Sequence, residues 1–185
     1  MYLLIGRKID MDEKEFFIKN LLDNYSVIKE EFMANRDDEK SFALPDFADP
    51  TVHLEHWRTY YLWSRFKTLK QFLKRFPKTA KIIENGPGKY TGGFLLLAPH
   101  STVPTHTHYD WPGEHYVLHL PIVVPEGDIG FVIDGKTHRW VEGQLLAFHC
   151  NQPHGTFNNT DGVRVILGLI FDPSWKSVLE PYMAT

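Results

Sequence analysis

The sequence predicts a mainly β protein with helices in its N-terminal part, arranged as a jelly roll. After Gly88 the chain consists of short runs rich in Val, Ile, Leu and Phe, separated by turn residues such as Gly, Pro and Asn. Before that point apolar residues recur at three- and four-residue intervals, which is typical of helices with one buried face. About seven short strands with frequent turns favour two packed sheets, with the helices outside them.

Length and composition favour one domain. A chain of 185 residues suffices for a single core, so we expect one domain over 1–185, with a helical supporting region at 1–87 and a jelly-roll core at 88–173. The net charge of -3 gives no overall attraction to nucleic acid or to an anionic membrane. Because Cys150 is the only cysteine and the opening apolar run is short, we expect a cytoplasmic protein with no membrane segment.

Three helices are expected in the N-terminal part. The apolar stripe of the first is Phe17, Leu21, Tyr25, Ile28 and Phe32. A polar loop is expected from Asp37 to Val52. The apolar stripe of the second helix is Leu62, Phe66, Leu69, Leu73 and Phe76. Its many basic residues lack interleaved aromatic side chains, which favours a solvated face over a nucleic-acid site. Pro77 predicts the start of a short third helix that ends at Gly86.

The strands expected after the helices follow the turn signals. They are Phe94–Ala98, Tyr116–Val124, Ile129–Ile133, Thr137–Val141, Gln144–His149, His154–Phe157 and Val163–Phe171. The pair Asp134-Gly135 predicts a tight hairpin between the third and the fourth of these strands.

A His-x-Asp pair is the first candidate for metal binding. His108 and Asp110 are two residues apart, and side chains at this spacing in an extended segment leave the same face. The pair alone is a weak signal, since it also occurs in ordinary polar loops. His154 begins a later strand, and Arg164 follows it by ten residues.

Arg164 is predicted to lie in a buried apolar wall. On the last strand it shares a face with Ile166, Gly168 and Ile170. Burying an unpaired guanidinium costs several kcal/mol, so it must meet a carboxylate of the protein or of a ligand. The small Gly168 leaves room for a ligand beside it.

Two histidines and one carboxylate can hold an iron ion and leave about three coordination positions open. A chelating 2-oxo acid and dioxygen can fill these positions together. The planar fork of an arginine matches the far carboxylate of such an acid better than a lysine does. If a 2-oxo diacid is the chelator at such a site, Arg164 is of the right chemical type to bind its far carboxylate.

The run "HYD…HLPI…GKTHRWVEGQLLAFHCNQPHGTFNNTDGVRVILGLIFDP" resembles the aspartyl/asparaginyl β-hydroxylase family of iron(II)- and 2-oxoglutarate-dependent dioxygenases. The resemblance covers roughly Phe76 to Pro173. It implies a cupin-like double-stranded β-helix and an oxidoreductase that hydroxylates an amino acid, a peptide side chain or a related small molecule. It also implies ligand roles. Fe(II) is held by His108, Asp110 and His154, and 2-oxoglutarate is bound by Arg164 with His119 nearby.

The chain departs from the family pattern at the second contact of 2-oxoglutarate. A basic residue is common in relatives where this chain has Val117, and a hydroxyl-bearing residue where it has Leu95 or a neighbour. The Arg-x-Ser pattern of many oxygenases is replaced here by Arg164 and Ile166. The second anchor of the cosubstrate therefore stays open.

Two other readings of the motifs remain. Counting forward from Pro99 favours His106 as the first ligand, whereas counting back from His119 favours His108. A set of His106, His108 and His154 would give a three-histidine cupin metalloenzyme that uses no 2-oxo acid. A non-catalytic ligand-binding barrel is the other alternative.

Several further side chains flank the predicted site. Tyr109, Trp111 and Trp140 either wall a substrate pocket or belong to the core. His115 is four residues before His119, hence on the same strand face, where substrate contact is possible.

Overall fold

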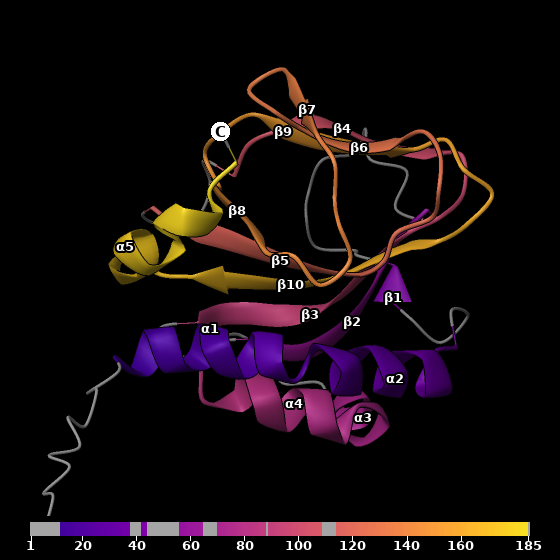
Figure 1. Cartoon of the computed structure of the whole chain (residues 1–185). Coiled ribbons are helices and arrows are strands. Elements are labelled where there is room, and N and C mark those ends of the chain that lie inside the picture. The colour runs from indigo at the N-terminus through magenta and orange to yellow at the C-terminus, as the bar shows by residue number, and fades with distance from the viewer. Residues whose placement is uncertain are drawn as a thin grey trace, which may run out of the picture.

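Two antiparallel sheets lie face to face and form a barrel (Figure 1). The computed structural model describes residues 12–37, 42–43, 56–64, 70–87, 89–108 and 114–184. The larger sheet contains, in spatial order, β1 (Phe42–Ala43), β2 (Trp57–Ser64), β3 (Lys89–Leu97), β10 (Arg164–Phe171), β5 (Tyr116–Val123) and β8 (Leu146–His149). The smaller sheet contains β4 (Ser101–His106), β9 (His154–Asn158), β6 (Ile129–Ile133) and β7 (Lys136–His138).

The order of the strands identifies the barrel as a jelly roll. From β3 onward the chain crosses between the sheets, so that β3-β10-β5-β8 faces β4-β9-β6-β7. Sequence-adjacent strands β3 and β4 thus lie in opposite sheets, and the last strand, β10, returns to lie between β3 and β5. This winding is that of a double-stranded β-helix and confirms the fold class predicted from the sequence.

Helices cover the outer face of the larger sheet (Figure 1). They are α1 (Glu13–Asp23), α2 (Tyr25–Asn35), α3 (Lys70–Arg75) and α4 (Pro77–Glu84). The stripe predicted for the first helix is buried, apart from the partly exposed Tyr25, but a break at Asn24 divides it between α1 and α2. The helix predicted after Pro77 is confirmed as α4. Three short elements follow the barrel: η2 (Pro173–Trp175), α5 (Lys176–Leu179) and η3 (Glu180–Tyr182). Among the described helices, none combines the length and the apolar composition needed to cross a membrane.

Strand alternation divides the apolar side chains into two cores. On β10, Val165, Leu167 and Leu169 pack with the helices, whereas Ile166 packs inside the barrel. The helical layer therefore supports one face of the larger sheet and leaves the other face for the barrel interior. That interior is the only place in a jelly roll where a ligand can be enclosed between the sheets.

Three strands, β1, β2 and β4, were not predicted, and one predicted helix is wrong over its first part. The short β1 lies within the predicted polar loop from Asp37 to Val52. Residues 57–64 form β2 instead of helix. The segment pairs with β3, and the buried Tyr60 and Leu62 alternate with side chains of the opposite face. Phe66 and Leu69 of the same predicted stripe lie outside the described residues, as does most of the predicted loop from 37 to 52. The supporting region at 1–87 thus contributes strands as well as helices.

Strand β4 was not predicted, because its composition is unusual for a strand. It contains Pro104 and several polar residues, which argue against a central strand. It lies at the edge of the smaller sheet, where a proline is tolerated. The hairpin between β6 and β7 is confirmed, because Asp134 and Gly135 have φ of 49° and 78°, the left-handed values that a tight hairpin turn requires.

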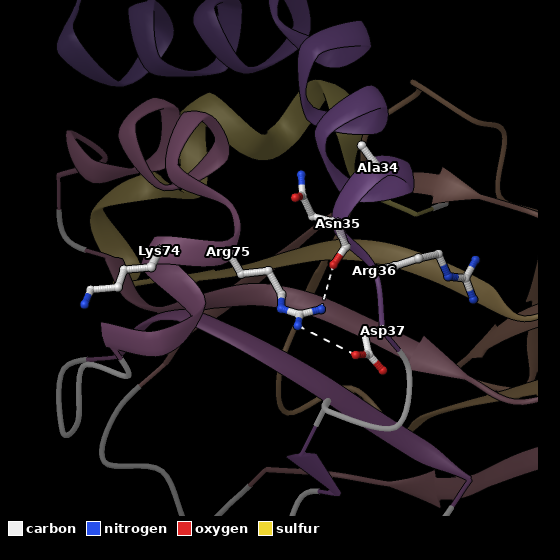
Figure 2. Close-up of a pocket in the computed structure, with 6 residues that line it drawn as sticks. All are labelled: Ala34, Asn35, Arg36, Asp37, Lys74 and Arg75. Carbon is white, nitrogen blue, oxygen red and sulfur yellow. Dashed lines mark hydrogen bonds and ion pairs between the residues drawn. The ribbon is translucent and has the colours of Figure 1, made fainter.

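An open surface hollow of about 530 Å³ lies where the end of α2 meets α3 (Figure 2). A guanidinium nitrogen of Arg75 donates a hydrogen bond to the backbone oxygen of Asn35 at 2.7 Å, and the other lies 3.8 Å from the carboxylate of Asp37. These contacts fasten the two helices to each other. The hollow shares no lining residue with the cavities inside the barrel.

The turn at Glu142 joins the barrel to the helical layer. Its carboxylate accepts a hydrogen bond from the backbone N–H of Val124 at 2.9 Å and forms an ion pair with Lys29 of α2. Partial burial acts against ionisation, but the hydrogen bonds from Lys29 and Val124 hold the pKa of Glu142 below its ordinary value. Gly143 follows with a φ of 77°, which favours glycine.

We expect Glu142→Gln to lower the free energy of unfolding at pH 7 by about 1 kcal/mol or less, because the ion pair is partly exposed. A carboxylate whose pKa is lower in the folded than in the unfolded protein stabilises the fold at pH values above its unfolded pKa. This contribution is lost as the pH falls toward the folded pKa. The difference in the free energy of unfolding between variant and wild type should therefore decrease as the pH falls below 4.5, the ordinary pKa of a glutamate. Denaturant unfolding from pH 7 to pH 3 measures this, with the exposed Glu126→Gln as control. A difference that does not change with pH would contradict the account.

Candidate metal and anion site

Three histidines converge at one end of the smaller sheet. His106 ends β4 and His154 begins β9, and these residues face each other in the pairing of the two strands. His108 follows two residues after His106, where its backbone N–H donates to the oxygen of Cys150 at 3.3 Å. One ring nitrogen from each histidine lies within 4.8 Å of the others. Two nitrogens that bind one ion at about 2.1 Å are at most about 4.2 Å apart, so small side-chain rotations suffice.

Backbone carbonyls fix the tautomers of two of these rings. Nδ1 of His106 lies 2.8 Å from the oxygen of Pro104, and Nδ1 of His154 lies 2.7 Å from the oxygen of Gln152. A carbonyl oxygen only accepts, so each Nδ1 must carry the proton and donate it. The lone pair is then on Nε2, and an N–H held in this way is the usual outer support of a metal-binding histidine.

Burial keeps two of the rings neutral. It lowers the pKa of His108 to about 3, and the nearby His154 and His106 act in the same direction. Burial also lowers the pKa of His154 to about 4, although the contact with Gln152 opposes the shift. Both rings are therefore unprotonated at pH 7, which is the form that binds metals.

The structure brings together only part of the predicted ligand set. His108 and His154 lie in the cluster, and so does His106, which the sequence offered only as an alternative. Asp110 lies outside the described residues, together with Tyr109 and Trp111. The signal for His106 in the sequence was its spacing of two from His108, which puts both side chains on one face of an extended segment.

Arg164 lies inside the barrel next to this cluster. Its side chain lines a cavity of about 60 Å³ together with His106, His119 and His154. The guanidinium carbon is 4.7 Å from the ring centre of Trp140, a cation–π contact. Burial lowers the pKa of Arg164 to about 9, so the group is still charged at neutral pH. In the described part of the chain no carboxylate forms an ion pair with it.

His119 lies in the same cavity, on the neighbouring strand β5. Its ring contacts Phe131 and Phe148, with ring centres 5.1 and 5.2 Å away. Burial lowers the pKa of His119 well below its ordinary value, and the charge of Arg164 adds to the effect. His119 is therefore neutral. His115, the other histidine near this strand, is buried but lines neither cavity beside the cluster.

A second cavity, of about 70 Å³, is lined by His108. Its side-chain lining is uncharged and mainly apolar, and includes Trp57, Leu95, Val117 and Ile170. Gly168 on β10 also lines this cavity, whereas the sequence placed its free space beside Arg164, which lines the other cavity. A Cβ at Gly168 would lie 2.8 Å from the side chain of Leu95, so the glycine keeps this part of the wall open.

The fold and these residues define a cupin-like jelly-roll barrel with a cluster of metal-competent histidines. The model of the aspartyl/asparaginyl beta-hydroxylase family matches residues 22–173, more than half of the chain. The chain therefore belongs to this family, and the resemblance drawn from the sequence motifs is confirmed.

Two curated relatives are named hydroxylases. The ornithine lipid ester-linked acyl 2-hydroxylase of Rhizobium tropici is 29% identical over 143 residues, which cover 72% of this chain and 50% of that protein. The human aspartyl/asparaginyl beta-hydroxylase is 26% identical over 170 residues, covering 89% of this chain and 22% of that protein. The chain thus spans half or less of the length of these relatives. Among solved structures, the cupin domain of Cnp3 from Schizosaccharomyces pombe has a TM-score of 0.43 at 7% identity, with 70% of this chain and 74% of that one covered.

We expect the histidine cluster to bind one divalent metal ion per chain, and Fe(II) is used as the probe. Replacing a ligand should cost more than the roughly 10- to 100-fold loss typical of an outer supporting contact. His154→Ala should therefore weaken iron binding by about 100-fold or more, measured anaerobically by competition with a chromophoric chelator. His100→Ala is the control, since this exposed histidine pairs with Asp161 at the surface. Equal affinities in wild type and His154→Ala would exclude the cluster as the metal site.

Proposed function

We propose that this protein is an Fe(II)- and 2-oxoglutarate-dependent hydroxylase. The observation that carries the proposal is the buried, charged Arg164 beside the histidine cluster, without a carboxylate partner in the described residues. A 2-oxo diacid that chelates a metal at the histidines would bring its far carboxylate to this guanidinium. Membership of a hydroxylase family supports the same chemistry.

The residues present fit a metal with nitrogen ligands. Imidazole suits iron as well as zinc and copper, so the donor set permits iron without selecting it. His108 and His154 would hold the ion, with Asp110 as the third ligand. When bound, iron would activate dioxygen while 2-oxoglutarate is oxidised to succinate and carbon dioxide, and one oxygen atom enters the substrate as hydroxyl.

The chain's own contribution is placement and exclusion of water. Arg164 would bind the far carboxylate through its planar fork. His119 is a neutral neighbour of that carboxylate. The apolar walls around both cavities exclude water from the reacting centre, which protects a reactive oxidant from side reactions.

The lining of the second cavity restricts the chemical class of substrate. The side chains next to His108 are uncharged, so we propose that the substrate places an uncharged, mainly aliphatic portion there. An apolar amino acid side chain, a peptide side chain or an acyl group fits this requirement. The name of the relative from Rhizobium tropici, an acyl 2-hydroxylase, is consistent with it.

One observation favours a second candidate function. The cluster of His106, His108 and His154 is complete without a carboxylate, as in a three-histidine cupin metalloenzyme that needs no 2-oxo acid. In that case Asp110 would be dispensable and 2-oxoglutarate would not be consumed.

Succinate release separates the two functions. With Fe(II), dioxygen, 2-oxoglutarate and a panel of amino acids, peptides and acylated amino acids, we expect succinate from the wild type. Asp110→Ala should abolish it and His106→Ala should largely spare it, because only Asp110 supplies a carboxylate ligand. Iron content of each variant is measured in parallel. An active Asp110→Ala with an inactive His106→Ala would show that His106 is the third ligand, and no succinate under any condition would refute the proposed function.

A further inference from the structure

Three side chains that line one cavity each carry a buried nitrogen atom without a hydrogen-bond partner. These atoms are Nδ1 of His119, Nε1 of Trp140 and Nε of Arg164. The three side chains are only 6%, 5% and 2% exposed. A buried polar group without a partner costs about 1–3 kcal/mol, so three of them around one small space indicate a site made for a ligand.

The chemistry of the cavity selects an anion. Arg164 is positively charged, Trp140 has only a donor, and no carboxylate lines the space. The remaining lining is mostly hydrocarbon, including Leu95 and Ile166. The volume of about 60 Å³ equals roughly two water molecules at about 30 Å³ each, which suits one carboxylate group.

The indole of Trp140 is held so that its N–H stays free. The guanidinium of Arg164 lies over the ring at 4.7 Å, and Phe131 stacks on it with ring centres 5.3 Å apart and an interplanar angle of 22°. Both contacts use the flat faces of the indole. The N–H lies in the plane of the ring, so neither contact uses it.

The backbone around Trp140 is fixed from outside the barrel. Two residues after Trp140, the carboxylate of Glu142 accepts hydrogen bonds from the backbone N–H of Val124 and from Lys29. The next residue is Gly143, whose N–H donates to the oxygen of Pro121 at 3.1 Å. A donor on such an anchored turn is preorganised for a ligand. Leu95 lines the same cavity and offers no hydrogen-bond donor.

We propose that the indole N–H of Trp140 is the second anchor of the cosubstrate, donating a hydrogen bond to the distal carboxylate that Arg164 binds. This inference rests on the proposed function. It assigns to Trp140 the hydrogen-bond donor that Leu95, in the same cavity, does not supply.

The test compares two ligands with two proteins. Trp140→Phe keeps an aromatic ring under Arg164 and removes the N–H. Calorimetry of the anaerobic Fe(II)-loaded proteins measures Kd for 2-oxoglutarate and for 2-oxovalerate, which has a methyl group in place of the distal carboxylate. A hydrogen bond to a charged group is worth at least about 1.4 kcal/mol, so we expect about a tenfold rise in Kd for 2-oxoglutarate and less than about a twofold change for 2-oxovalerate.

The outcomes are separable. Equal rises for both ligands mean that Trp140 acts only through packing, and no rise for either overturns the inference while leaving the proposed function intact. A wild type that binds no 2-oxoglutarate refutes the proposed function itself. Trp63→Phe, an indole that lines neither cavity, is the matched control and should change neither Kd.

A measurement on the wild type covers the case in which Trp140→Phe does not fold. With zinc in place of iron, the ¹⁵N–¹H resonance of the Trp140 indole should move downfield on addition of 2-oxoglutarate. It should move much less with 2-oxovalerate. Equal movement with the two ligands would contradict the inference.

Discussion

A charged guanidinium inside an apolar barrel is the constraint on which the rest of the site depends. Arg164 is buried between the sheets, and burial lowers its pKa only to about 9, so it stays charged at neutral pH. The face of Trp140 offsets part of the cost of removing this charge from water. A carboxylate would offset much more, and none forms an ion pair with Arg164 in the described part of the chain. A ligand that carries one is therefore the simplest completion of the site.

Side chains on β10 point alternately to its two faces, so that one set packs in the core shared with the helices and the other lines the candidate site. The side chains of Val165, Leu167 and Leu169, which alternate with that of Arg164 on β10, belong to the same apolar core as buried residues of α1, α2 and α4. Arg164, Ile166 and Gly168 face the interior. The smaller sheet brings the histidines to the same interior, because His106 and His154 are paired residues of adjacent strands. The site thus needs both sheets, and neither sheet alone contains it.

The sequence predicted the features that depend on local pattern. Short apolar runs between turn residues predicted seven strands, and each overlaps an observed strand, β3 or one of β5 to β10. The burial of Arg164 was predicted from its apolar strand. The sequence could not predict β2, because a stretch of aromatic and basic residues fits a helical stripe as well as a strand until its pairing with β3 is known. The place of His106 likewise depends on an edge strand with a proline. The N–H of Trp140 has no partner because its neighbours Arg164 and Phe131 contact the flat faces of the ring. Residue spacing in the sequence does not predict such contacts. Asp110 stays a prediction.

The most direct test of the central claim is the dependence of 2-oxo acid binding on the charge of Arg164. Anaerobic addition of 2-oxoglutarate to the Fe(II)-loaded protein should produce a weak visible charge-transfer band, which reports chelation and gives an apparent Kd. In Arg164→Met the band should still form, but at concentrations at least about tenfold higher, as expected for the loss of a charge-assisted contact. Iron binding should be unchanged. A wild type that gives no band, or an Arg164→Met variant that binds 2-oxoglutarate as tightly as the wild type, would contradict the account.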